Sequence, residues 1–81
     1  MVAEEPLRIE VRINEHMSIE DYVVWNIAGT VSTLMTKPEE KDITLMVYEI
    51  HKEILTGKGA TPEQLLESDR LLEKFRAQYN V

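Results

Sequence analysis

Near the start of the chain, apolar and polar side chains alternate strictly over residues 7–14. The apolar positions, which share one face, are Leu7, Ile9, Val11 and Ile13. The intervening positions are Arg8, Glu10, Arg12 and Asn14. A period of two residues is typical of a half-buried strand, so the sequence predicts a β-strand here, after a flexible polar leader over residues 1–6. A strand cannot satisfy its own backbone hydrogen bonds, and it therefore needs a partner strand.

Beyond Ser18 the apolar residues recur at spacings of three and four, which indicates a helix. They are Ile19, Tyr22, Val23, Ile27, Val31 and Leu34. Ser18 suits the N-cap position, and Asp21 lies three residues later, where an acidic side chain completes a capping box. Two features argue against one regular helix: the β-prone run over residues 22–25, and Gly29, which costs about 1 kcal/mol relative to alanine. The alternatives are two helices with a turn near residues 26–29, or a strand within this stretch.

A second helix is predicted to begin at Pro38, because proline suits the first helical position and acidic residues follow in the first turn. The glycines at positions 57 and 59 end it. Its predicted core face consists of Ile43, Met46, Val47, Ile50, Ile54 and Leu55. Residues 43–50 also allow a buried strand. His51, which stands between Glu49 and Glu53, is predicted to lie in solvent rather than to bind a metal.

The third helix has a clear start signal. Thr61-Pro62-Glu63-Gln64 combines an N-cap residue, a proline at the first helical position and a capping-box glutamine. The helix is predicted over residues 62–79, with a core side formed by Leu65, Leu72, Phe75 and Tyr79. The expected fold is therefore mostly α with one N-terminal strand, in the order β-α-α-α, as a single small domain over residues 7–81.

The predicted strand has four possible partners: a second copy of the chain, another protein, or a strand within residues 23–31 or 43–50. The chain has 81 residues and no cysteine, so its core is small and no disulfide reinforces it. This favours a homodimer whose strands pair through their backbone groups, with Leu7, Ile9, Val11 and Ile13 on the inner face of the strand pair. A strand pair within one chain would permit a monomer.

The charge of the chain bears on its partners. Fifteen acidic and nine basic residues give a net charge of −6, which disfavours nucleic acid because phosphate contacts need clustered Lys and Arg. Arg8 and Arg12, on one face of the predicted strand, are the candidate nucleic-acid contacts. No stretch approaches the roughly 20 apolar residues of a membrane span, and the absence of cysteine fits a reducing compartment. We expect a cytoplasmic protein without a membrane partner.

Residues with catalytic potential are scarce. The serines at positions 18, 32 and 68 have no base at a catalytic spacing, and the histidines are His16 and His51. The sequence has no phosphate-binding glycine loop and no histidine pair with metal-ligand spacing. We therefore predict no catalytic residue, no metal site and no cofactor.

Two short motifs resemble a known family. Residues 8–13 read R-I-E-V-R-I, and residues 26–35 read N-I-A-G-T-V-S-T-L-M. This order resembles the ribbon-helix-helix antitoxins of plasmid addiction modules, the CcdA type, in which R-I-x-V-x-V is followed after one helix by N-I-S-G-x-V-S-T-x-M. The resemblance covers residues 7–35. It implies a homodimer with two antiparallel paired strands and with Arg8, Glu10 and Arg12 facing the major groove of DNA.

A second resemblance lies near the C-terminus. The two helices around T-P-E-Q-L-L-E-S-D-R-L-L are similar to the helical hairpins of sporulation-type aspartyl-phosphate phosphatases, which carry S-Q-E-L-D. This chain has S-D-R-L-L at residues 68–72, without the glutamine and the last acid.

These observations favour binding over chemistry. We expect a small, acidic, non-enzymatic regulatory protein, antitoxin- or inhibitor-like, that acts by binding a partner protein. The alternatives are a homodimeric ribbon-helix-helix repressor and a small phosphatase-like helical hairpin.

Overall fold

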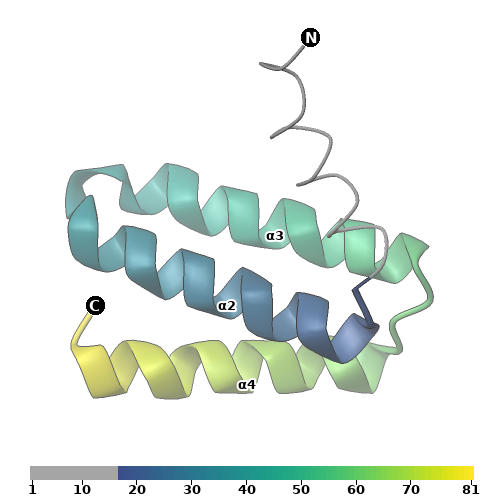
Figure 1. Ribbon diagram of the computed structural model, residues 1–81. Coiled ribbons are helices and arrows are strands. Elements are labelled where there is room, and N and C mark those ends of the chain that lie inside the picture. The colour runs from purple at the N-terminus through teal and green to yellow at the C-terminus, as the bar shows by residue number, and fades with distance from the viewer. Residues whose placement is uncertain (1–16) are drawn as a thin grey trace, which may run out of the picture.

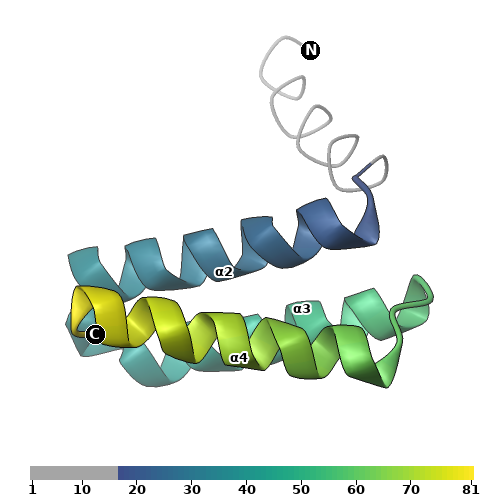
Figure 2. The same cartoon turned by 90° about the horizontal axis from the view of Figure 1, so that it is seen from below.

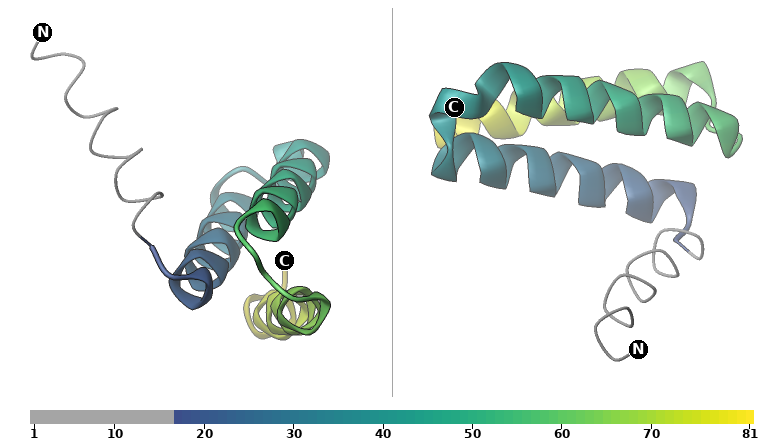
Figure 3. Two further views of the ribbon diagram at one scale, coloured as in Figure 1. Left: turned by 90° about the vertical axis from the view of Figure 1, so that its right-hand side faces the viewer. Right: turned by 90° about the horizontal axis from the view of Figure 1, so that it is seen from above.

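The computed structural model describes residues 17–81, which form three helices joined by short connections (Figure 1). The elements are α2 (Ile19–Thr36), the 3₁₀-helix η2 (Pro38–Glu40), α3 (Lys41–Gly57) and α4 (Pro62–Tyr79). Helices α2 and α4 run in the same direction, and α3 runs in the opposite one (Figure 1). Seen end-on, the three helices stand at the corners of a triangle (Figure 3, left).

The predicted fold class is wrong for this part of the chain. Residues 17–81 contain no strand, and both stretches that allowed one, 23–31 and 43–50, are helical. The residues of the predicted N-terminal strand lie outside the described part. Residues 26–35, which carry the ribbon-helix-helix resemblance, do not follow a separate helix but lie within the continuous helix α2. The described residues therefore form an antiparallel three-helix bundle rather than a ribbon-helix-helix half.

Helix α2 forms because its start is capped and its apolar stripe is buried. The Ser18 hydroxyl accepts a hydrogen bond from the Asp21 backbone N–H at 3.1 Å, as the sequence predicts. Five of the six predicted stripe residues are buried: Tyr22, Val23, Ile27, Val31 and Leu34. The helix continues through Gly29 without a break, because burial of this face outweighs the unfavourable local propensities.

The predicted core face of α3 is wrong. Of its six residues only Leu55 is buried, whereas Ile43, Met46, Val47, Ile50 and Ile54 are all exposed. The buried residues of α3 are Thr44, Tyr48 and Leu55. This face is more polar than the predicted one, but its hydroxyl groups have partners: the Thr44 hydroxyl donates to the Glu40 carbonyl at 2.8 Å, and Tyr48 bonds to side chains of α4.

Helix α4 begins as predicted and packs partly as predicted. Thr61 and Gln64 form a reciprocal capping box, with hydrogen bonds of 3.1 and 2.8 Å. Leu72 is buried, and Leu65 and Phe75 pack against the core at its edge. Tyr79 is about half exposed, which contradicts its predicted place in the core.

The core lies on the inner faces of the three helices. Its buried residues are Tyr22, Val23, Ile27, Val31, Tyr48, Leu55, Ala60 and Leu72. Helix α2 packs against both α3 and α4, and α4 runs alongside it in the view from below (Figure 2). Within residues 17–81, no helix combines the length and apolarity that a membrane crossing requires.

Candidate functional site

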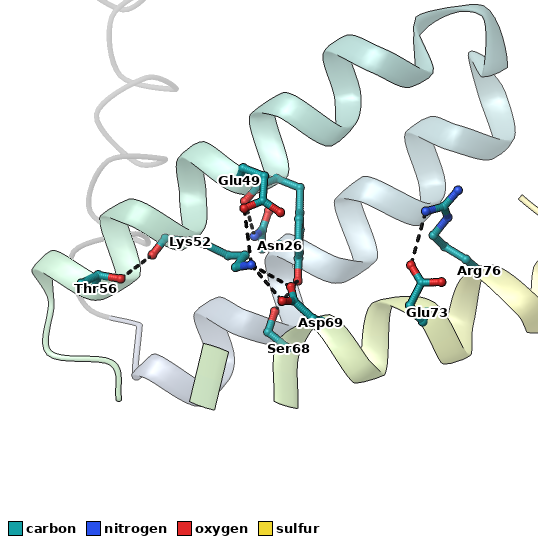
Figure 4. Close-up of polar contacts among 9 residues, drawn as sticks. Asn26, Glu49, Lys52, Thr56, Ser68, Asp69, Glu73 and Arg76 are labelled. Carbon is teal, nitrogen blue, oxygen red and sulfur yellow. Dashed lines mark hydrogen bonds and ion pairs between the residues drawn. The ribbon is translucent and has the colours of Figure 1, made fainter. Parts of the chain in front are cut away.

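A network of polar side chains bridges α3 and α4. The Tyr48 hydroxyl donates to Asp69 Oδ1 at 2.8 Å and lies 2.7 Å from Ser68 Oγ. Because a phenol carries one proton and a carboxylate only accepts, Ser68 is the donor to the Tyr48 oxygen. Lys52 Nζ donates to both carboxylate oxygens of Asp69, at 2.8 and 3.0 Å, and lies 3.4 Å from Glu49 (Figure 4). We call Tyr48, Lys52, Ser68 and Asp69 the polar bridge.

The environment of the polar bridge fixes its protonation. Burial raises the pKa of Tyr48 well above 10, and the neighbouring Asp69 raises it further, although the hydrogen bond from Ser68 lowers it. Burial lowers the pKa of Lys52, but the hydrogen bond and charge of Asp69, together with Glu49, outweigh this and raise the pKa above its usual 10.5. The phenol is therefore neutral and the ammonium charged near neutral pH, as their hydrogen bonds require.

The polar bridge is built to join helices. Ser68, which the sequence left without a partner, is completely buried, and its hydroxyl is engaged by Tyr48. His51, the histidine of the described part of the chain, does not take part in it, because its hydrogen bond goes to Tyr22 on the α2 side. The motif at residues 68–72 that resembles the phosphatase hairpin thus contributes Ser68 and Asp69 to contacts within the bundle.

Asn26 links α2 to α3 at the middle of both helices. Its side-chain Nδ2 donates to the backbone carbonyl of Tyr48 at 3.2 Å, and the residue is buried. Among the described residues, no buried side-chain nitrogen or oxygen lacks a hydrogen-bond partner. The sequence offered a signal for this role, because Asn26 is a polar residue within the apolar stripe of the predicted helix, next to Ile27.

His51 lies in an aromatic cluster, not in solvent as predicted. The Tyr22 hydroxyl lies 2.7 Å from His51 Nδ1, and the Trp25 ring meets the imidazole edge-on with a centroid distance of 5.1 Å. Burial lowers the pKa of His51, so the imidazole is neutral near pH 7, and the tautomer of the ring decides which of Nδ1 and the Tyr22 hydroxyl donates their hydrogen bond. In the described part of the chain, no three acidic, histidine or cysteine side chains gather in a way that could hold a metal ion.

An apolar groove runs along the surface between α2 and α4. It has a volume of about 480 Å³, and its lining is Val24, Ile27, Ala28, Val31, Ser32, Met35, Thr36, Leu71, Phe75 and Tyr79. Val24, Met35 and Tyr79 are each about half exposed, so the groove opens to solvent along its length. We call it the α2–α4 groove.

A second apolar surface lies on the other side of α2. A groove of about 320 Å³ runs between α2 and α3, with Trp25 and Gly29 on one side and Ile43, Val47 and Glu40 on the other. A Cβ atom at Gly29 would meet no other atom within 4 Å, so the glycine leaves this groove open. The groove continues onto the exposed face of α3. We call Ile43, Met46, Val47, Ile50 and Ile54 the α3 stripe.

The site residues predicted at the N-terminus lie outside the described part of the chain. This applies to the predicted dimer face, Leu7, Ile9, Val11 and Ile13, and to the predicted nucleic-acid contacts, Arg8 and Arg12. They stay predictions. No protein-family model, no curated protein sequence and no solved structure matches this chain.

Proposed function

We propose that this chain is a non-enzymatic interaction protein that binds a partner protein by holding an amphipathic helix of that partner in the α2–α4 groove. The observation that carries the proposal is the groove itself: an open channel between two helices of the same direction, lined almost entirely by apolar side chains. A groove of this kind is the usual acceptor for the apolar face of a helix.

The dimensions of the groove suit a short helical segment. Its α2 wall extends from Val24 to Met35, which at 1.5 Å per residue is about 17 Å. Three anchor side chains of a partner helix, at positions i, i+4 and i+7, span about 10 Å and fit within this length. The volume of about 480 Å³ also lies within the range of natural binding pockets.

The charge of the chain supports a basic partner. The net charge of −6 attracts cationic segments and raises their rate of encounter, whereas apolar contacts within the groove provide affinity. The partner segment is thus a helix with an apolar face and basic flanks. An inhibitor- or antitoxin-like protein would use such a contact to regulate the partner.

The test selects helical peptides of about 15 residues from a displayed library against the full chain and measures their affinities by fluorescence anisotropy. Met35→Glu places a charge inside the groove, and Leu66→Glu is the matched control because Leu66 is exposed but does not line the groove. We expect Met35→Glu to weaken binding at least tenfold and Leu66→Glu to leave it unchanged. Failure to select any basic amphipathic helix, or equal binding by both variants, contradicts the proposal.

A further inference from the structure

Five large apolar side chains of α3 are exposed by 43 to 57%, and all belong to the α3 stripe. At 3.6 residues per turn they fall within a sector of about 100° that contains no charged residue. The acidic side chains Asp42, Glu49 and Glu53 lie beside this sector, and Trp25 of α2 adjoins its other border through the α2–α3 groove. In the end-on view, α3 stands at one corner of the bundle (Figure 3, left).

We propose that the α3 stripe pairs with the same stripe of a second copy of this chain, so that the two α3 helices lie antiparallel about a twofold axis between residues 48 and 49. This homodimer goes beyond the proposed function, because it uses a different face of the bundle from the α2–α4 groove.

The spacing of the stripe supports a second copy as the occupant. Ile43, Val47, Ile50 and Ile54 follow one another at intervals of four, three and four, which is the spacing of a coiled-coil seam. These intervals are the same when read in reverse. A twofold axis at the centre of the stripe therefore places Ile43 opposite Ile54 and Val47 opposite Ile50 in both halves of the dimer, as a self-complementary interface requires.

The aromatic cluster at the border of the stripe fits the same arrangement. The twofold axis brings like borders of the two stripes together, so the border on the α2 side, which carries Val47 and His51, faces the same border of the other copy. Trp25 contacts His51 edge-on at 5.1 Å and is 42% exposed, so its free surface borders the position of the partner copy's Val47. An aromatic ring that is covered by an apolar side chain adds buried apolar area to the seam.

The charges at the border are complementary in this arrangement. Glu40 precedes α3 and Lys58 follows it, 18 residues apart, so they lie on the same flank after about five turns. Glu40 lines the α2–α3 groove, which places this flank on the side of α2. In the antiparallel pair, Lys58 of each copy comes beside Glu40 of the other. Two ion pairs thus border the apolar seam, where they favour the antiparallel register.

The area of the stripe is of the size that a dimer needs. The five side chains expose on the order of 500 Å² of apolar surface together, at the upper end of what a monomer leaves uncovered. A standard interface buries about 800 Å² on each partner. The stripe supplies most of this area, and Trp25 with the polar residues at the border supplies the remainder.

Sedimentation equilibrium of the full chain tests the dimer. We expect twice the mass of one chain at micromolar concentration, and at least tenfold weaker association for Ile50→Glu, because the symmetry places each new charge in the interface twice. Val47→Glu is the second variant, and circular dichroism verifies that each variant stays helical. Leu66→Glu is the matched control and Met35→Glu isolates the α2–α4 groove; both should dimerise as the wild type does.

Two results overturn the proposal. One is a chain that stays monomeric throughout the micromolar range. This result overturns the proposal regardless of whether residues 1–16 of the same chain or a different protein cover the stripe. The other is a dimer whose association neither Ile50→Glu nor Val47→Glu weakens, because the contact then lies elsewhere in the chain.

Disulfide cross-linking tests the direction of the two helices, since the chain has no cysteine of its own. Ile43→Cys and Ile54→Cys are purified separately, mixed to allow subunit exchange, and oxidised. The antiparallel register predicts cross-linked dimers in the mixture and few in either variant alone. Efficient cross-linking of each variant with itself indicates parallel helices and overturns the proposed register.

Discussion

Substitution of Tyr48 by phenylalanine removes the central hydroxyl of the polar bridge and leaves the shape of the ring unchanged. The substitution removes the hydrogen bonds of this hydroxyl with Asp69 Oδ1, at 2.8 Å, and with Ser68 Oγ, at 2.7 Å. Ser68 is completely buried, so water does not replace the phenol. Asp69 keeps its ion pair with Lys52 and is partly exposed, so water partly replaces the hydrogen bond that Asp69 loses. The main effect is therefore a buried serine without a partner for its proton.

The expected cost follows from these environments. An unsatisfied buried hydroxyl costs about 1–3 kcal/mol, and a hydrogen bond to a charged acceptor contributes about 1.5–3 kcal/mol. Because solvent and Lys52 reduce the second contribution, we expect Tyr48→Phe to lower the free energy of unfolding by about 2–3 kcal/mol. A domain of this length has a total free energy of unfolding of about 4–12 kcal/mol. If the free energy of unfolding falls by about 1 kcal/mol per molar of urea, the unfolding midpoint shifts down by about 2–3 M.

Urea unfolding followed by far-ultraviolet circular dichroism measures this shift at one fixed protein concentration, since dimerisation would add to stability. Tyr79→Phe is the matched control, because Tyr79 is about half exposed and lies outside the polar bridge. Adding Ser68→Ala to Tyr48→Phe removes the unpaired hydroxyl and should restore about 1 kcal/mol. An unfolding midpoint for Tyr48→Phe within 0.3 M of the wild type, roughly the precision of the slope and extrapolation, would refute the reasoning.

Three further perturbations have defined outcomes. Burial lowers the pKa of His51 below its usual 6.5, so the unfolded chain binds this proton more readily than the folded one. The contribution of His51 to the free energy of unfolding is therefore fully present above pH 6.5 and decreases below it. His51→Gln should reduce this decrease, measured by urea unfolding between about pH 7.5 and 5.5. Asn26→Ala removes the link to the Tyr48 carbonyl and should cost about 1–2 kcal/mol in the same assay; no change contradicts it. Lys58→Glu should weaken dimerisation in sedimentation equilibrium, and Glu40→Lys added to it should restore dimerisation; additive weakening contradicts the proposed pairing.

Local signals in the sequence located the starts of α2 and α4 correctly, whereas Pro38, the predicted start of the second helix, begins the 3₁₀-helix η2 and α3 begins at Lys41. Ser18 and Thr61 cap their helices as predicted, because a cap depends on residues only three positions away. The apolar stripe of α2 was also predicted, since its period is clear and most of its members are buried. The break near Gly29, which the sequence left open as an alternative, does not occur, because packing on two sides stabilises α2 beyond its local propensity.

The buried face of α3 was not predictable from its own residues. Apolarity favours the side with Ile43 and Ile50, yet the bundle buries the side with Tyr48. The sequence pattern measures apolar surface, but it does not count the hydrogen-bond partners that other helices supply to a polar group. The sequence signal that was missed is the presence of a polar residue on an otherwise apolar helix face. This applies to Asn26 on α2 and to Ser68 on α4.

The sequence by itself determined where α2 and α4 begin and which face of α2 is buried, because these features depend on neighbours within a few residues. The tertiary structure alone decided which side of α3 faces inward, and hence that a seam of isoleucine and valine stays on the surface. The physical reason is that the contacts that orient α3 join residues far apart in the sequence. Tyr48 reaches Asn26 across 22 residues and Ser68 across 20. Only the folded bundle brings these partners together.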